Sequence, residues 1–105
     1  MKRFAPAAES YAKAIRWSDF ESAHFFAKHL ESKPDLNRLK KFKVISYEVK
    51  KIIHQREHLK VLQNVALSYY NKDQLTEKNL SYQEIWEYDD KDGSWYLTSG
   101  FPAFK

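Results

Sequence analysis

Leu80-Ser81-Tyr82-Gln83-Glu84-Ile85-Trp86-Glu87-Tyr88 has the alternating pattern of a β-strand and leads into the polar turn Asp89-Asp90-Lys91-Asp92-Gly93. An apolar run resumes at Trp95-Tyr96-Leu97. Asp-Gly between two aromatic, alternating segments predicts a β-hairpin, because glycine accepts the positive φ that such turns require. The aromatic side chains of this hairpin need a partner layer, and the N-terminal third of the chain offers helices for it.

Helical spacing marks the N-terminal third. Apolar residues recur at helical intervals from about Ala7 to Trp17, which predicts a first helix. Ser18 and Glu21 form a capping-box pattern, which predicts a second helix from there to about Leu30. Pro34 suits the first turn of a third, short helix that ends near Leu39, because an N–H at that position would be unpaired anyway.

The stretch from Phe42 to Tyr70 contains neither glycine nor proline. Its first half is β-branched and aromatic, and its second half is apolar at alternate positions, interrupted by Gln63. A helical template also fits part of the second half, but apolar residues would surround one helix over the whole stretch. We therefore expect two strands, over about 42–54 and 58–70, followed by a turn and then a loop over 74–79.

These elements predict a single α+β domain over residues 1–105, helical at about 7–40, with a curved antiparallel sheet of about four strands at about 42–100. A chain of 105 residues has room for one core. Seven Phe, seven Tyr and three Trp allow few residues to bury much area.

At this point the chain resembles the nuclear-transport-factor-2-like superfamily, which has a cone-shaped α+β fold. Ala14-Ile15-Arg16-Trp17-Ser18-Asp19-Phe20-Glu21-Ser22-Ala23 is similar to the junction after the family's first helix, and Glu84–Tyr88 with Gly93–Leu97 to its last hairpin. The resemblance implies helices on a curved sheet and a pocket. The superfamily includes isomerases, dehydratases, transport adaptors and small bacterial envelope proteins, so the fold implies little about chemistry. None of the family's catalytic motifs aligns here, and we predict no catalytic residue.

Composition and charge exclude several classes of function. The charge of +4 comes from 18 basic and 14 acidic residues that are interspersed along the chain. The acidic residues of the last third would repel phosphate. We therefore expect no nucleic-acid partner. Without cysteine there is no disulfide, thiol catalysis or cysteine zinc site. No run is long enough to insert into a membrane. The chain as written shows no export signal, which predicts the cytoplasm, or the cell envelope if such a signal was trimmed.

His54-Gln55-Arg56-Glu57-His58 matches the H-x-x-E-H pattern of zinc peptidases, in which both histidines share one helical turn. Here the pattern falls between two strand-like runs, where a turn would separate the two imidazoles. His24 and His29 are five apart on a predicted helix and do not share a face. We expect neither a bound metal nor a cofactor.

Polar residues interrupt the apolar side of two neighbouring strands. Glu84 lies among the aromatic residues of the third strand, and Gln63 lies among the apolar residues of the second. Two polar groups on adjacent concave strands are what a lined pocket needs. The candidate ligand-binding residues are Tyr47, Gln63, Tyr82, Glu84 and Trp86. The other interpretations are that a bulge or a bend turns these residues to solvent, or that a lysine pairs with the acid.

The second face of the sheet is the candidate interface. Helices can cover only one face of a four-stranded sheet, so the other must be polar or covered by a partner. Its mixture of polar and apolar residues is typical of a non-obligate interface. The candidate interface residues are Leu62, Tyr70 and Ile85, and a two-fold homodimer is the simplest closed arrangement. If the alternate residues of the strands are assigned to the two faces the other way round, the aromatic face contacts the partner instead.

We therefore expect a non-catalytic binding or interaction module for a protein partner or a small apolar ligand, of the kind found in bacterial envelope-associated domains. The alternative is a small isomerase- or dehydratase-type enzyme that uses Glu84 as a general base, with tyrosine hydroxyls as hydrogen-bond donors. A closed core around Glu84 favours the module. An open pocket into which Glu84 and tyrosine side chains converge favours the enzyme.

Overall fold

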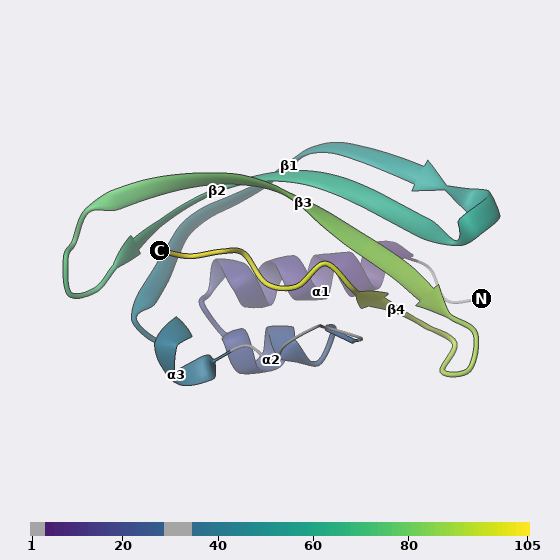
Figure 1. Ribbon diagram of the computed structural model, residues 1–105, viewed down its shortest axis with the longest axis horizontal. Coiled ribbons are helices and arrows are strands. Elements are labelled where there is room, and N and C mark those ends of the chain that lie inside the picture. Colours follow the sequence, from purple (N-terminus) through teal and green to yellow (C-terminus); the bar gives the residue numbers. More distant parts are fainter. Residues whose placement is uncertain (1–3, 29–34) are drawn as a thin grey trace.

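The computed structural model describes residues 4–28 and 35–105 of the chain. Its elements are α1 (Phe4–Arg16), α2 (Phe20–His24), α3 (Leu36–Leu39), β1 (Phe42–Gln55), the short 3-10 turn η1 (Arg56–His58), β2 (Lys60–Asn71), β3 (Glu77–Asp89) and β4 (Ser94–Leu97). The four strands form one antiparallel sheet in the order β1-β2-β3-β4, and the helices lie on its concave side (Figure 1). The predicted α+β fold is confirmed.

β2 shows how the sheet divides into two faces. Alternate residues of this strand are only 2–3% exposed, namely Val61, Gln63, Val65, Leu67 and Tyr69. This side of the sheet, which packs against the helices, is called the concave face below, and the opposite side the convex face. The two strands predicted between residues 42 and 70 are therefore confirmed, and the helical alternative is wrong.

β1 is an irregular edge strand. Its register against β2 shifts between Val44 and Ser46 and again between Val49 and Lys51. Each bulge adds a residue to one strand only, so it bends the strand and exchanges the faces of the residues beyond it. Because Tyr47 pairs with the buried Leu67, its side chain lies on the concave face.

α1 covers the concave face with apolar side chains. Tyr11 and Ile15 are both 0% exposed, and their spacing of four residues places them on one side of the helix. The ring of Tyr11 meets the ring of Trp86 on β3 edge-on, with 5.4 Å between centroids. The first helix is thus confirmed, although it begins earlier than predicted, at Phe4.

The second helix is shorter than predicted. α2 ends at His24, and the chain then runs beside β4. The Leu97 N–H donates to the carbonyl of Phe26 at 2.6 Å, and the Lys28 N–H donates to the carbonyl of Leu97 at 3.0 Å. Pairing with β4 thus supplies hydrogen bonds that a continued helix would otherwise supply. The predicted helical end at Leu30 lies outside the described residues.

Asp19, and not Ser18, caps α2. The Asp19 carboxylate accepts hydrogen bonds from the N–H of Ser22 at 3.2 Å and from its hydroxyl at 2.7 Å. Ser18 has a φ of 60°, and its hydroxyl accepts the N–H of Val44 at 2.9 Å. The predicted capping box of Ser18 and Glu21 is wrong, because the Ser18 hydroxyl bonds to β1 instead.

The remaining boundaries agree in part with the prediction. Asp35 caps α3, which ends at Leu39 as expected, while Pro34 lies outside the described residues. β3 begins at Glu77, where it pairs with Tyr70, so the loop predicted over 74–79 is shorter. The closing hairpin is confirmed, with Gly93 at a φ of 67° in its turn.

Residues 101–105 complete the core beside α3. Phe104 is 1% exposed, and its ring stacks on Phe42 at 5.4 Å and meets Tyr69 edge-on at 4.9 Å. Arg38 of α3 donates a hydrogen bond to the Phe104 carbonyl. The N–H of Lys105 donates to the Tyr69 hydroxyl at 3.0 Å. The chain beyond β4 is therefore anchored at the start of β1 and the end of β2.

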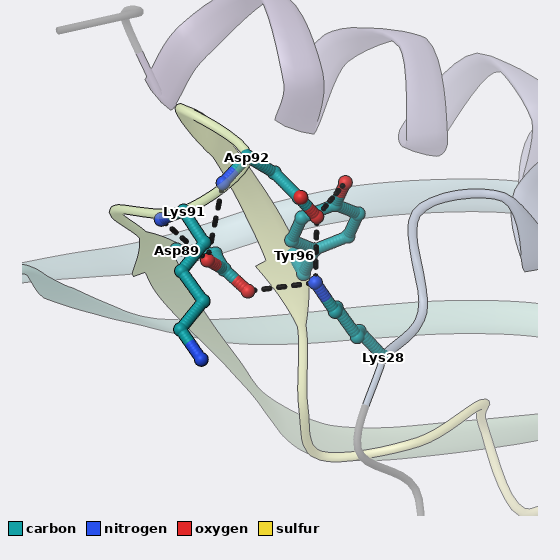
Figure 2. Close-up of polar contacts among 5 residues, drawn as sticks. All are labelled: Lys28, Asp89, Lys91, Asp92 and Tyr96. Atoms are coloured by element: carbon teal, nitrogen blue, oxygen red, sulfur yellow. Dashed lines mark hydrogen bonds and ion pairs between the residues drawn. The ribbon is translucent and has the colours of Figure 1, made fainter.

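A cluster of charges ties the segment after α2 to the closing hairpin. The Lys28 ammonium lies between the carboxylates of Asp89, at 2.7 Å, and Asp92, at 2.6 Å (Figure 2). It also lies 4.7 Å from the centroid of the Tyr96 ring. The hydrogen bonds from Lys28 lower the pKa of both aspartates and, in return, raise the pKa of Lys28 above its ordinary value.

Candidate functional site

Glu84 is a fully buried acid on the concave face of β3. Tyr82, Glu84 and Trp86 occupy alternate positions of the strand, so their side chains all point toward the helix layer. Glu84 is 0% exposed. A carboxylate in such a place is costly unless its oxygens accept hydrogen bonds.

Four side chains donate hydrogen bonds to Glu84. Its Oε1 accepts from Gln63 Nε2 at 3.0 Å and from Trp86 Nε1 at 3.1 Å. Its Oε2 accepts from the hydroxyls of Tyr47 at 2.6 Å and Tyr82 at 3.0 Å. Two hydrogen bonds to each oxygen use the usual accepting capacity of a carboxylate, so the buried group is satisfied.

The tyrosines of this cluster are held in their protonated form. Burial raises the pKa of Tyr47 and of Tyr82 far above the ordinary 10.0, and the charge of Glu84 raises both further. An ionised phenol here would be deprived of water and would face a carboxylate of the same charge. Both hydroxyls therefore act as donors to Glu84.

Tyr11 joins this cluster from α1 and was missed by the sequence reasoning. Its hydroxyl is buried and has no hydrogen-bond partner within the described residues. Burial and then the charge of Glu84 raise the pKa of Tyr11 well above 10.0, so the phenol lies within electrostatic reach of the acid. The helical period around Tyr11 indicates burial, but nothing in it indicates which strand the hydroxyl approaches.

The structure brings all five candidate pocket residues together, from three strands. Tyr47 comes from β1, Gln63 from β2, and Tyr82, Glu84 and Trp86 from β3. The interpretation that a bulge or bend turns Glu84 to solvent is wrong, because Glu84 is 0% exposed and both bulges of the β1–β2 pair lie in β1. The four side chains that donate to Glu84 are neutral, and none of them is a lysine. The role of these residues in ligand binding stays a prediction.

The cluster around Glu84 has one feature expected of an enzyme and one expected of a non-catalytic module. The tyrosine hydroxyls converge on the acid, as expected for an enzyme. Glu84 and Gln63 are closed off at 0% and 3% exposure, as expected for a module, and only Tyr47 and Tyr82 are half-buried. Solvent therefore meets the tyrosines first, and the carboxylate lies behind them.

The two histidines of the H-x-x-E-H pattern lie on different elements. His54 is in β1, where its ring meets Phe4 edge-on at 6.2 Å, and His58 is in the turn η1. No group of three or more potential metal-ligating side chains occurs in residues 4–28 and 35–105. His24 lies on α2, and its Nδ1 is buried without a partner in the same ranges, while His29 lies outside them.

The three candidate interface residues lie on the convex face. Leu62 pairs with Ile85 on one side and with Ile53 on the other, which makes an apolar row across three strands. Tyr70 lies near the other end of β2. Leu62, Tyr70 and Ile85 are half-buried, and Ile53 is 38% exposed. The convex face therefore offers a narrow apolar row rather than a wide patch.

Comparison with known proteins identifies the fold. The chain matches two bacterial structures at 16% sequence identity, and it therefore has the nuclear-transport-factor-2-like fold that its sequence resembles. One is an NTF2-like protein from Cytophaga hutchinsonii, with a TM-score of 0.63 over 92% of this chain and 93% of that one. The other is a ketosteroid isomerase-like protein from Erwinia carotovora atroseptica, with a TM-score of 0.59 over 90% of this chain and 87% of that one.

Neither a family model nor a curated protein matches the chain. Among the described helices, none is long and apolar enough to cross a membrane.

Proposed function

We propose that this protein is a non-catalytic interaction module that associates with a second copy of itself through the convex face of its sheet. The observation that carries the proposal is the closure of Glu84. A general base needs an accessible oxygen lone pair, and the oxygens of Glu84 already accept four hydrogen bonds behind the tyrosines. The cluster thus serves best as the rigid polar centre of the sheet.

The convex face supports the interaction part of the proposal. Helices cover the opposite face, and the row of Ile53, Leu62 and Ile85 is apolar among polar neighbours. Such a mixture suits a contact that forms between folded subunits. A two-fold axis through the face would place the same row on both copies.

Sedimentation velocity tests this proposal. Ile85→Asp and Tyr70→Asp should each weaken the dimer while the circular dichroism spectrum and the melting transition of the monomer persist. Gln74→Asp adds the same charge in the β2–β3 connection and should leave the dimer intact. A chain that sediments as a monomer at every concentration would refute the proposal, as would a dimer indifferent to both face variants.

A second candidate function, an isomerase-type enzyme, is favoured by one observation. The Tyr11 hydroxyl is buried, lacks a partner within the described residues and lies within electrostatic reach of Glu84. A substrate oxygen could accept its hydrogen bond while Glu84 moves a proton between two carbon atoms. Incubation with a β,γ-unsaturated ketone, followed by ultraviolet absorbance of the conjugated product, tests this. Turnover that is lost in Glu84→Gln would favour the enzyme, and no turnover would favour the module.

A further inference from the structure

The second half of β1 is exposed on both of its faces. Every residue from Glu48 to His54 is exposed, among them Val49 at 37%, Ile52 at 48% and Ile53 at 38%. β1 is also the first strand in the order of the sheet, and within residues 4–28 and 35–105 it is paired only with β2. A long edge strand with exposed β-branched residues is a template for pairing with another chain.

The first half of the same edge is blocked within the chain. The N–H of Val44 donates to the Ser18 hydroxyl at 2.9 Å, and its carbonyl accepts from Arg16 at 3.2 Å. Side chains from the junction of α1 and α2 thus occupy this part of the edge. The segment available for pairing begins beyond Val44.

The bulge between Val49 and Lys51 determines how β1 could pair with itself. In a regular strand, residues separated by an odd number lie on opposite faces, so they cannot oppose each other across a two-fold axis. The bulge adds one residue, so the residues after it lie on the opposite face from the one that regular alternation would give them. Glu48, opposite Ala66, and Lys51, opposite Asn64, consequently both lie on the convex face. The axis can therefore pass through the bulge itself.

We infer that β1 pairs antiparallel with β1 of a second copy, in the register that sets Glu48 against Lys51. The two-fold axis repeats this opposite-charge pair twice. The same register sets Tyr47 against Ile52 on the concave face and Ser46 against Ile53 on the convex face. The two residues of each of these pairs therefore lie on the same face of the joined sheet. In the isolated chain Glu48 has an exposed contact with Lys50 at 3.0 Å, and the partner's Lys51 competes for it.

This contact differs from the convex-face dimer and stands independently of it. Edge pairing joins two four-stranded sheets into one continuous sheet, whereas the face contact stacks one sheet on another. Lysines on an edge strand usually hinder pairing with other chains. Here the register places an acidic residue opposite Lys51. This opposite-charge pair favours a second copy of this chain over the edge strand of a different protein.

Charge reversal tests the register. Glu48→Lys and Lys51→Glu each create two like-charge pairs by symmetry, and each should weaken self-association by about tenfold or more. The double variant Glu48→Lys with Lys51→Glu restores both pairs and should return to within about threefold of the parent. Sedimentation equilibrium measures the constants, and Ile85→Asp reports separately on the face contact. Single variants that associate as tightly as the parent would overturn the inference.

Cross-linking gives a second readout that does not depend on affinity. The chain has no cysteine, so Glu48→Cys with Lys51→Cys introduces the only thiols. Opposed residues of paired strands lie about 5 Å apart, within disulfide reach, whereas the two positions in one strand are about 10 Å apart. Mild oxidation should give a covalent dimer. Glu48→Cys with Ile52→Cys, on opposite faces, should not. Absence of the first cross-link in a protein that still dimerises would overturn the edge register and leave the face contact.

Discussion

Tyr47 of β1 and Glu84 of β3 are joined by a hydrogen bond of 2.6 Å, although β2 lies between their strands. Gln63 of β2, which pairs with Glu84, donates through its amide to the other oxygen of the same carboxylate. The bond from Tyr47 is the shortest of the four hydrogen bonds that Glu84 accepts. One acid thus ties three strands together on the side that faces the helices.

Tyr47→Phe should lower the free energy of unfolding by about 1.5–3 kcal/mol, the usual contribution of a hydrogen bond to a charged group. The variant keeps the ring and removes one of the four donors to Glu84. Urea denaturation measures the loss. Tyr88→Phe is the matched control, because the Tyr88 hydroxyl donates no hydrogen bond within the described residues, and it should change little. Equal effects from both variants would show that the cluster around Glu84 does not stabilise the fold.

Stability should fall at alkaline pH. The folded-state pKa values of Tyr47 and Tyr82 are raised above the ordinary 10.0, so above that pH the unfolded chain releases protons that the folded chain retains. The contribution is complete below pH 10 and is lost as the pH rises toward the folded-state values. Urea denaturation at about pH 9 and about pH 11 measures it. The double variant Tyr47→Phe with Tyr82→Phe should show a smaller difference between the two, and an unchanged difference would contradict the assignment.

Phe104→Ala should destabilise the fold by about 3–5 kcal/mol, since it empties a site between three aromatic rings. The ring of Phe104 packs against Phe20, Phe42 and Tyr69 and is 1% exposed. Thermal unfolding measures the change. Phe25→Ala removes the same ring at a position that is 81% exposed and is the matched control. A small effect at Phe104 would mean that residues 101–105 are not part of the cooperative core.

Leu75→Gly should raise the free energy of unfolding by up to about 1 kcal/mol. Leu75 is 75% exposed and has a φ of 57°, a conformation that costs a non-glycine residue about 1–2 kcal/mol and that glycine accepts. Ser18→Gly relieves a similar φ of 60° but removes the acceptor of the Val44 N–H, so it should give no gain. Chemical denaturation of the two variants side by side distinguishes strain from hydrogen bonding.

The candidate site could be predicted because it lies on strands. In a strand, alternate residues share a face, so Glu84 and Gln63 stand out as polar interruptions of an apolar side. Tyr47 was within reach of the same reasoning because its segment was predicted as a strand. Tyr11 was not, because the approach of a helix to a sheet depends on packing between distant segments rather than on a local period.

The errors of prediction share a physical cause. The second helix stops at His24 because the following segment pairs with Leu97, a contact between opposite ends of the chain. The bulges of β1 fall at Val44–Ser46 and Val49–Lys51, with no glycine to indicate them. Ser18 has the sequence pattern of a helix cap, but its hydroxyl accepts a hydrogen bond from the N–H of Val44. Each of these features depends on a partner that is remote in the sequence.

The anchoring of residues 101–105 has a consequence for synthesis on the ribosome. The helices emerge first, but the groups that cover them emerge last: Lys28 bonds to Asp89, 61 residues later, and Arg38 bonds to Phe104, 66 residues later. Contacts between such distant segments slow folding, because long loops must close before the contacts form. A nascent chain that has released only β1 to β3 therefore still lacks part of its core. This domain should complete its fold only after its final aromatic residue has left the exit tunnel.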